Sequence, residues 1–165
     1  GLPPTSLEVE LTESALMDDP KGAQTTLRTL HDMGIALSID DYGTGYSSLA
    51  TLHELPLDVL KIDQSFIAKM SEDHCFAALV HAVTTLAQNL GLATVAEGIE
   101  TSDQVAMLQS MDCDYGQGHY FAKPMSSDEA LAYLRSHATV SPEWSSVDSL
   151  SASMLHSSPV LHCPE

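Results

Sequence analysis

Short apolar stretches alternate with amphipathic helical segments along most of this chain, and this alternation constrains the fold more than any other feature. The stretches cover residues 7–11, 35–39, 57–62 and 92–96, and a less clear one lies within residues 114–121. Strands that alternate with helices form parallel sheets, either open and doubly wound or closed into a barrel. A closed eight-stranded barrel takes about 250 residues, so the roughly five strand–helix units found here would make a partial barrel that lacks about three strands on its N-terminal side.

The helical segments carry residues that favour helix ends. Such signals occur at Asp19, Pro20, Gly34, Gly91, Thr101, Gln104, Ser126 and Glu129. The last four form two pairs with capping-box spacing, in which a Ser or Thr and a Gln or Glu three residues later cap a helix start reciprocally. The 3.6-residue period predicts that the first helix buries one face, made of Ala23, Leu27, Leu30 and Met33.

From residue 138 onward the periodicity stops, and the segment 138–165 is rich in serine. We therefore expect one domain over residues 1–137 and a disordered tail over 138–165. The three cysteines are widely spaced and include no CxxC pair, which argues against a disulfide framework and favours a reducing cytoplasm. No stretch approaches the about 18 apolar residues of a membrane span, so direct membrane insertion is not expected.

The chain is strongly acidic. Asp and Glu number 23 against 6 Lys and Arg, which gives a formal net charge of −17. This charge repels a phosphate backbone, so a DNA or RNA polymer is not an expected partner. A smaller anionic ligand would need metal ions, because the basic residues are scattered rather than clustered.

Polar side chains follow the expected strands at the points where they end. In chain order they are Glu10, Thr12, Glu13, Asp40, Asp41, Lys61, Asp63, Glu97, Glu100 and Gln117. The carboxyl ends of parallel strands share one rim, where ligands bind in α/β folds. Carboxylates gathered there repel one another unless a cation neutralises them. Oxygen donors without His or Cys favour Mg²⁺ or Mn²⁺, and the adjacent Asp40 and Asp41 could hold two ions about 3.5 to 4 Å apart.

Several of these residues also have simpler interpretations. Asp63 precedes a helical segment and is explained equally well as its N-cap. Lys61 lies inside an apolar strand and needs a carboxylate partner, which a purely structural salt bridge would supply. Glu13 and Glu100 could be solvated surface charges.

Five segments resemble, in order and spacing, the later part of EAL domains, the bacterial phosphodiesterases that linearise cyclic di-GMP. They are ELTES, IDDYGTGYSSL, LKIDQSF, VAEGIE and GQGHYFAKPM, and the resemblance runs from about Leu7 to His137. It implies a partial (β/α)8 barrel of the TIM type with the site at the carboxyl ends of its strands. It also implies hydrolysis of cyclic di-GMP to linear pGpG with two Mg²⁺ or Mn²⁺ ions.

Position by position, the resemblance implies roles for the rim residues. The implied metal ligands are Glu10, Asp40, Asp41 and Glu97. The implied catalytic residues, which act on the attacking water, are Lys61, Glu97 and Gln117. Glu13 resembles the glutamate that braces the loop after Asp41, while Asp63 and Glu100 match substrate-binding positions. The segment DDYGTGYSSL resembles a loop tied to metal binding and to homodimer contact, with Tyr42 where the family more often has Phe.

The chain departs from the family at its start. The signature Glu-Ala-Leu tripeptide, an arginine that contacts phosphate and an asparagine that binds metal would all precede residue 1. We therefore expect the chain to be inactive and prone to association when tested alone, and its parent protein to be active and fused to upstream sensory or GGDEF domains. Two alternatives stay open: a barrel that uses Mg²⁺ to abstract a proton beside a carboxylate, and a non-catalytic module that binds cyclic di-GMP or a partner protein.

Overall fold

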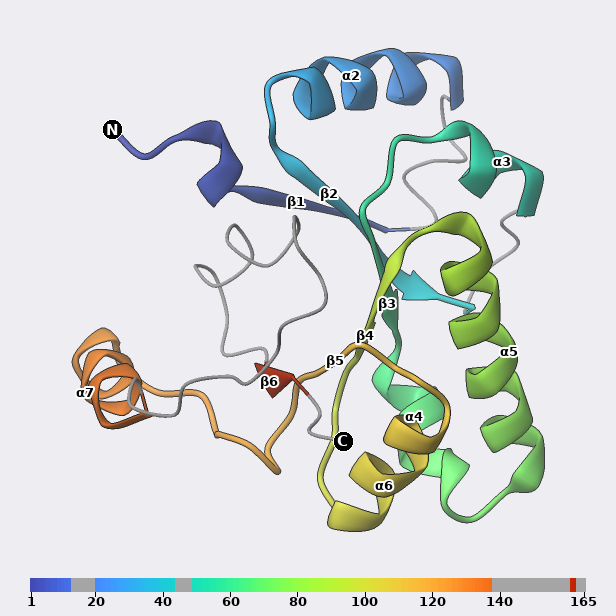
Figure 1. Ribbon diagram of the computed structural model, residues 1–165, viewed down its shortest axis with the longest axis vertical. Helices are drawn as coiled ribbons and strands as arrows, with labels where there is room; N and C mark the ends of the chain where they lie inside the picture. Colours follow the sequence, from blue (N-terminus) through green and yellow to red (C-terminus); the bar gives the residue numbers. More distant parts are fainter. Residues whose placement is uncertain (13–19, 44–48, 138–160, 163–165) are drawn as a thin grey trace.

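The computed structural model describes residues 1–12, 20–43, 49–137 and 161–162. Its elements in chain order are η1 (Pro4–Ser6), β1 (Glu8–Thr12), α2 (Pro20–Asp32), β2 (Ala36–Tyr42), α3 (Leu49–Glu54), β3 (Val59–Ile62), α4 (Gln64–Met70), α5 (His74–Leu90), β4 (Ala93–Ala96), α6 (Ser102–Ser110), β5 (Tyr115–Gly116), α7 (Ser127–His137) and β6 (Leu161–His162). Figure 1 shows the strands side by side at the centre, with most of the helices around them.

The strand order decides between the two architectures that the sequence pattern leaves open. The strands β1 to β5 are parallel and follow one another across the sheet in chain order. In a doubly wound sheet the order of the strands reverses at a switch point. In a TIM barrel each strand lies next to the strand that precedes it in the chain. The predicted partial barrel of five parallel strands is therefore confirmed.

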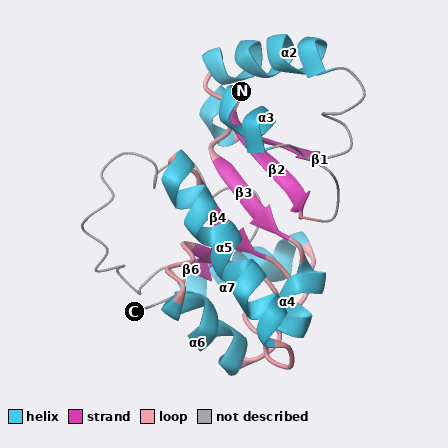
Figure 2. Cartoon of the chain, turned by 90° about the vertical axis from the view of Figure 1, so that its right-hand side faces the viewer, coloured by secondary structure: helices cyan, strands magenta, loops and turns pink. Residues whose placement is uncertain are grey.

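Alternate residues of each strand face the helices and form the core. On β3, Leu60 and Ile62 are buried in the main apolar cluster, while Val59 and Lys61 are buried outside it. Successive strand side chains point to opposite faces, so Val59 and Lys61 point to the inner side of the partial barrel. Figure 2 shows α5 running alongside β3 and β4, the strands that it contacts. The inner side is the one that carries the polar rim.

Two aspartates at the amino ends of strands hold neighbouring strands in register. Asp58 Oδ2 accepts a hydrogen bond from Leu37 N at 2.8 Å, which ties the start of β3 to β2. Asp114 Oδ2 accepts from both Thr94 N and Thr94 Oγ1 at 2.8 Å, which ties the start of β5 to β4. The first of these bonds fixes the register of β3, which carries Lys61, against β2.

The two predicted capping boxes are present. Gln104 N donates to Thr101 Oγ1 at 3.3 Å, and Thr101 N donates to Gln104 Oε1 at 3.0 Å. Glu129 N donates to Ser126 Oγ at 3.4 Å, and Ser126 N donates to Glu129 Oε2 at 2.8 Å. Gly91 ends α5 with a φ of +74°, as a helix-terminating glycine does.

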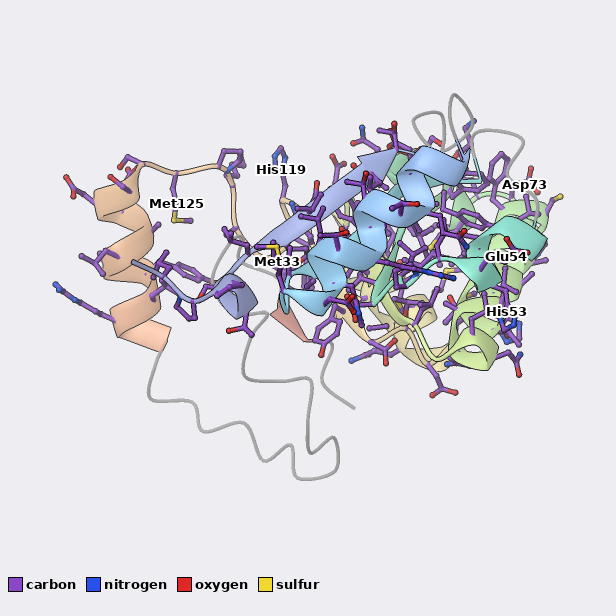
Figure 3. The ribbon with its side chains drawn as sticks, turned by 90° about the horizontal axis from the view of Figure 1, so that it is seen from above. Met33, His53, Glu54, Asp73, His119 and Met125 are labelled. Carbon is purple, nitrogen blue, oxygen red and sulfur yellow. The ribbon has the colours of Figure 1, made fainter. Side chains whose placement is uncertain are left out.

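The buried face predicted for the first helix is wrong at one residue. Leu27 is 2% exposed, but Met33 is 55% exposed and stands beyond the end of α2 (Figure 3). The helix stops at Asp32, and the chain turns at Gly34 with a φ of +84°, so Met33 no longer follows the helical period. The expected N-cap Asp19 lies outside the described residues.

The segment expected to be a disordered tail contributes one short strand. β6 pairs antiparallel with β5, with Leu161 opposite Gly116 and His162 opposite Tyr115. The other residues of 138–165 lie outside the described part of the chain. Across the described residues, no helix combines the length and apolar character needed to cross a membrane.

Candidate functional site

Three carboxylates from separate elements converge on one buried lysine. The Lys61 side chain is 9% exposed, and its Nζ lies 2.6 Å from Glu97 Oε1 and 2.9 Å from Glu10 Oε1. Asp40 Oδ1 lies 3.6 Å from the same nitrogen. We call Lys61, Glu10, Asp40 and Glu97 the lysine-centred rim. The structure thus brings together four of the residues that the sequence placed at the strand ends.

The parallel register explains the convergence. Thr12 of β1 pairs with Asp40 of β2, and Lys61 of β3 pairs with Val95 of β4. Glu97 directly follows β4, and its backbone N–H donates to Ile62 O at 3.1 Å, which continues the ladder beyond the strand. The carboxyl ends of the four strands therefore lie at one level, and their inward side chains meet.

A bulge in β2 lies at the two adjacent aspartates, Asp40 and Asp41. Ile39 pairs with Leu60 but Tyr42 pairs with Ile62, so β2 uses three steps where β3 uses two. The extra residue breaks the strict alternation of side chains. Asp41 has a left-handed φ of +55°, and its N–H donates to Asp40 Oδ1 at 2.9 Å.

The Asp41 carboxyl lies among other negative charges. Burial raises its pKa, and the neighbouring Asp40 and Asp63 raise it further. The pKa of Asp63 moves the other way: burial acts to raise it, but hydrogen bonds from Ser65 prevail and lower it. Asp63 is thus held as an anion beside a carboxyl that resists ionisation.

The lysine-centred rim carries more negative than positive charge. Burial acts to lower the pKa of Lys61, but hydrogen bonds to Glu97 and Glu10 outweigh it and raise the pKa above the ordinary lysine value. Burial raises the pKa of Glu97, and the nearby Asp40 and Glu10 add to this, against the opposing effect of Lys61. One ammonium group therefore leaves the three carboxylates incompletely neutralised.

The donor chemistry of the rim fits a hard divalent cation. Carboxylate oxygens are the ligands that Mg²⁺, Mn²⁺ and Ca²⁺ prefer, and incompletely neutralised carboxylates gain most from such an ion. Among the described residues, however, no three His, Cys, Asp or Glu side chains are grouped so that they could hold an ion together. In this arrangement the Lys61 ammonium takes the position on which Glu10, Asp40 and Glu97 converge.

The remaining predicted site residues are Asp63, Gln117, Glu100 and Glu13. Asp63 is the N-cap of α4 and accepts from Ser65 N at 3.0 Å and from Ser65 Oγ, so the N-cap interpretation is confirmed. Gln117 continues the ladder past β5, with its N–H 2.8 Å from Ala96 O. Glu100 is exposed and lines a surface cavity of about 660 Å³ between α4 and the start of α6. Glu13 lies outside the described residues, as does the part of the DDYGTGYSSL loop at 44–48.

Two contacts of α4 were not anticipated. Ser65 holds Asp63, a role that an Asp followed two residues later by Ser could have indicated. The ring of Phe66 lies against Gly43, with Phe66 Cζ 3.1 Å from the position that a Cβ would take on the glycine. No local sequence signal marks this second contact, because the two residues belong to different elements.

Comparison with known proteins finds a matching family model and several similar proteins. The EAL domain family model matches residues 1–124. The cyclic di-GMP phosphodiesterase NbdA of Pseudomonas aeruginosa is 42% identical over 137 residues, which are 83% of this chain and 18% of NbdA. The cyclic di-GMP phosphodiesterase RocR of the same organism is 39% identical over 132 residues, which are 80% of this chain and 34% of RocR.

Solved structures are also similar to this chain. The PaMucR phosphodiesterase in complex with c-di-GMP superposes with a TM-score of 0.76 at 42% identity, over 78% of this chain and 52% of that chain. The manganese and cy-diGMP complex of Klebsiella pneumoniae BlrP1 superposes with a TM-score of 0.70 at 32% identity, over 75% of this chain and 32% of that chain. The chain therefore spans about half of the first of these structures and about a third of the second.

Proposed function

This chain belongs to the EAL domain family, and we propose that it supplies the lysine-centred part of the active site of a cyclic di-GMP phosphodiesterase. The observation that carries the proposal is the convergence of Glu10, Asp40 and Glu97 on the buried Lys61. Relatives named as cyclic di-GMP phosphodiesterases, and a related phosphodiesterase solved with c-di-GMP, support the choice of substrate. The product would be linear pGpG, formed by cleavage of one phosphodiester bond of the ring.

We propose that Glu10, Asp40, Asp41 and Glu97 hold two hard divalent cations, Mg²⁺ or Mn²⁺. Structures of the related BlrP1 with calcium or manganese support this choice. When bound, such ions lower the pKa of a coordinated water and neutralise charge on phosphate oxygens. The ions would also convert an acidic rim into a receptor for an anionic dinucleotide, which the net charge of −17 would otherwise repel.

The side chains of this chain then have separate tasks. Lys61 is positively charged and buried, so it can orient the attacking water and stabilise negative charge that develops at phosphorus. Glu97 has a raised pKa, which makes it a better proton acceptor near neutral pH than an ordinary glutamate. Gln117 would complete the hydrogen bonds to this water, while Asp63 and Glu100 would lie on the substrate side.

The wider setting belongs to the same proposal. We propose that the site works in the cytoplasm, that Glu13 braces the loop after Asp41, and that the DDYGTGYSSL region contributes to a homodimer contact. We also propose that this chain is part of a longer protein with sensory or GGDEF domains, as the bifunctional relative MucR suggests. The 165-residue chain by itself is expected to show no turnover, because its single Glu-Ala-Leu tripeptide, residues 129–131, lies in helix α7 (Ser127–His137) and not at a strand end beside the rim.

A second function is favoured by one observation. The described residues include no ready-made group of three metal-binding side chains, and the three rim carboxylates are already paired with Lys61. A module that binds cyclic di-GMP or a partner protein without hydrolysing the dinucleotide would need no metal. The two functions differ in a single measurable product.

The test is hydrolysis by a completed barrel. The chain is fused behind the N-terminal half of the PaMucR phosphodiesterase domain, and the fusion is incubated with cyclic di-GMP and Mn²⁺. Formation of pGpG that is lost in Lys61→Met but kept in the matched control Lys69→Met supports catalysis by this rim. A folded fusion that binds cyclic di-GMP and yields no pGpG supports the binding module instead.

A further inference from the structure

The aromatic ring of Phe66 occupies the space beside the bare backbone of Gly43. Its Cζ and Cε2 atoms lie 3.1 and 3.4 Å from the position that a Cβ would take on this glycine. Gly43 has a φ of +97°, a conformation that favours glycine, so two independent constraints select this residue. The contact joins the first turn of α4 to the turn that follows β2.

This turn directly follows the bulge that aims Asp41. Asp41 is left-handed at a φ of +55°, and Tyr42 between the two turn residues is 8% exposed and pairs with Ile62. A left-handed non-glycine residue persists only where its surroundings hold it. The backbone is held before the turn by the β2–β3 pairing, and after it by the ring of Phe66.

The first turn of α4 carries both a capping carboxylate and the ring that contacts Gly43. Asp63 caps α4, and Phe66 lies three residues further along the same first turn. Behind it, the ring of Phe66 meets the ring of Phe76 on α5, with centroids 5.9 Å apart, and Lys69 Nζ lies 4.8 Å from the Phe76 ring. A ring supported from behind can act as a fixed stop for Gly43.

We propose that Phe66 is a positioning residue that fixes the direction of the Asp41 carboxyl by bearing on Gly43. Phe66 acts through the backbone of residues 41–43. Because Asp41 is a proposed metal ligand, the effect of Phe66 on metal affinity rests on the proposed function. Its effect on the backbone of Asp41 does not.

The first experiment measures Mn²⁺ affinity of the full 165-residue chain by isothermal titration calorimetry. Residues that orient a metal ligand typically contribute about 10- to 100-fold to affinity, so Phe66→Leu is expected to weaken Mn²⁺ binding about tenfold. Phe76→Leu is the matched control, because it removes a ring from the same cluster but not from Gly43. It removes only the support behind Phe66 and is expected to weaken binding less than Phe66→Leu does, and equal losses in the two variants would overturn the proposal.

The second experiment needs no metal. The amide of Asp41 donates to Asp40 Oδ1, and its hydrogen exchange rate reports how firmly the bulge is held. Exchange at Asp41 is expected to be clearly faster in Phe66→Leu and to change less in Phe76→Leu, which leaves the Phe66 ring against Gly43. If the wild-type chain binds no Mn²⁺, the proposed metal site fails, and this measurement alone decides the role of Phe66: equal exchange rates in both variants would refute it.

A third variant approaches the contact from the glycine side and does not depend on Phe66→Leu folding well. Gly43→Ala places a methyl group 3.1 Å from Phe66 Cζ and is expected to speed exchange at Asp41. Adding Phe66→Leu removes the ring that the methyl meets, so the double variant is expected to recover part of the loss. Effects that simply add would show that the two residues act independently, contrary to the proposal.

Discussion

Lys61 Nζ lies 2.6 Å from Glu97 Oε1, across the boundary between β3 and the segment that follows β4. The pair is mostly buried, with the lysine side chain 9% and the glutamate side chain 21% exposed. The ordinary effect of such a pair is to lower the pKa of the carboxylate, yet burial raises the pKa of Glu97, and Asp40 and Glu10 push it the same way. The rim is therefore arranged for more positive charge than Lys61 alone provides.

Replacing Lys61 with methionine should destabilise the chain at neutral pH. The variant leaves Glu10, Asp40 and Glu97 facing one another without a cation, and removing one partner of a buried pair costs about 3–5 kcal/mol. Urea unfolding at pH 7 measures the loss. The control Lys69→Met removes an exposed lysine whose cation–π contact with Phe76 is worth about 0.5–1 kcal/mol. Similar losses in the two variants would show that Lys61 does not hold the rim together.

Glu97 should make the folded state less stable as the pH rises. Its pKa is raised above the ordinary value of 4.5, so between that value and the raised one the folded chain binds more protons than the unfolded chain. Stability falls with pH wherever the folded state binds more protons, so this contribution is lost as the pH rises through the window. Glu97→Gln removes the titrating group, and the wild-type minus variant difference in unfolding free energy should decline from pH 4.5 upward. A difference that stays flat would contradict the raised pKa.

Substitutions at Asp41 should affect stability and metal binding differently, because this residue has a left-handed backbone. Asp41→Gly removes the strain and should be about 1 kcal/mol more stable than Asp41→Ala, since an L-residue pays about 1–2 kcal/mol for this conformation. Both variants should weaken Mn²⁺ binding, because both lack the carboxylate. Asp112 has the same φ of +55° outside the rim and serves as the control. Its Gly and Ala variants should differ in stability by a similar amount, with Mn²⁺ binding unchanged; a loss of binding there would argue against a specific role for Asp41.

Much of the fold follows from local signals. The capping boxes at Thr101 and Ser126, and the apolar stretches that became β1 to β4, depend on neighbouring residues and on period, which the sequence displays directly. The meeting of Glu10, Asp40, Lys61 and Glu97 also follows, because the carboxyl ends of parallel strands share one rim.

What could not be predicted depends on contacts between elements. The bulge at Asp40 and Asp41 arises from the register of β2 against β3, and the Phe66–Gly43 contact from the placement of α4 against the turn. The sequence places these four residues at one rim, but it does not show which atoms pair there, such as the contact of Lys61 Nζ with Glu97 Oε1 at 2.6 Å. Met33 was misplaced because the helical period was extended one residue past the actual end of α2.

The most direct test of the account is the position of Mn²⁺ in a crystal of the PaMucR fusion, located by anomalous scattering. We expect Mn²⁺ peaks within about 2.0–2.6 Å of carboxylate oxygens of Asp40 and Asp41, with Glu97 shared between the metal site and Lys61. Mn²⁺ bound elsewhere, or no Mn²⁺ at the rim of a fusion that still produces pGpG, would contradict the claim that these carboxylates form the metal site.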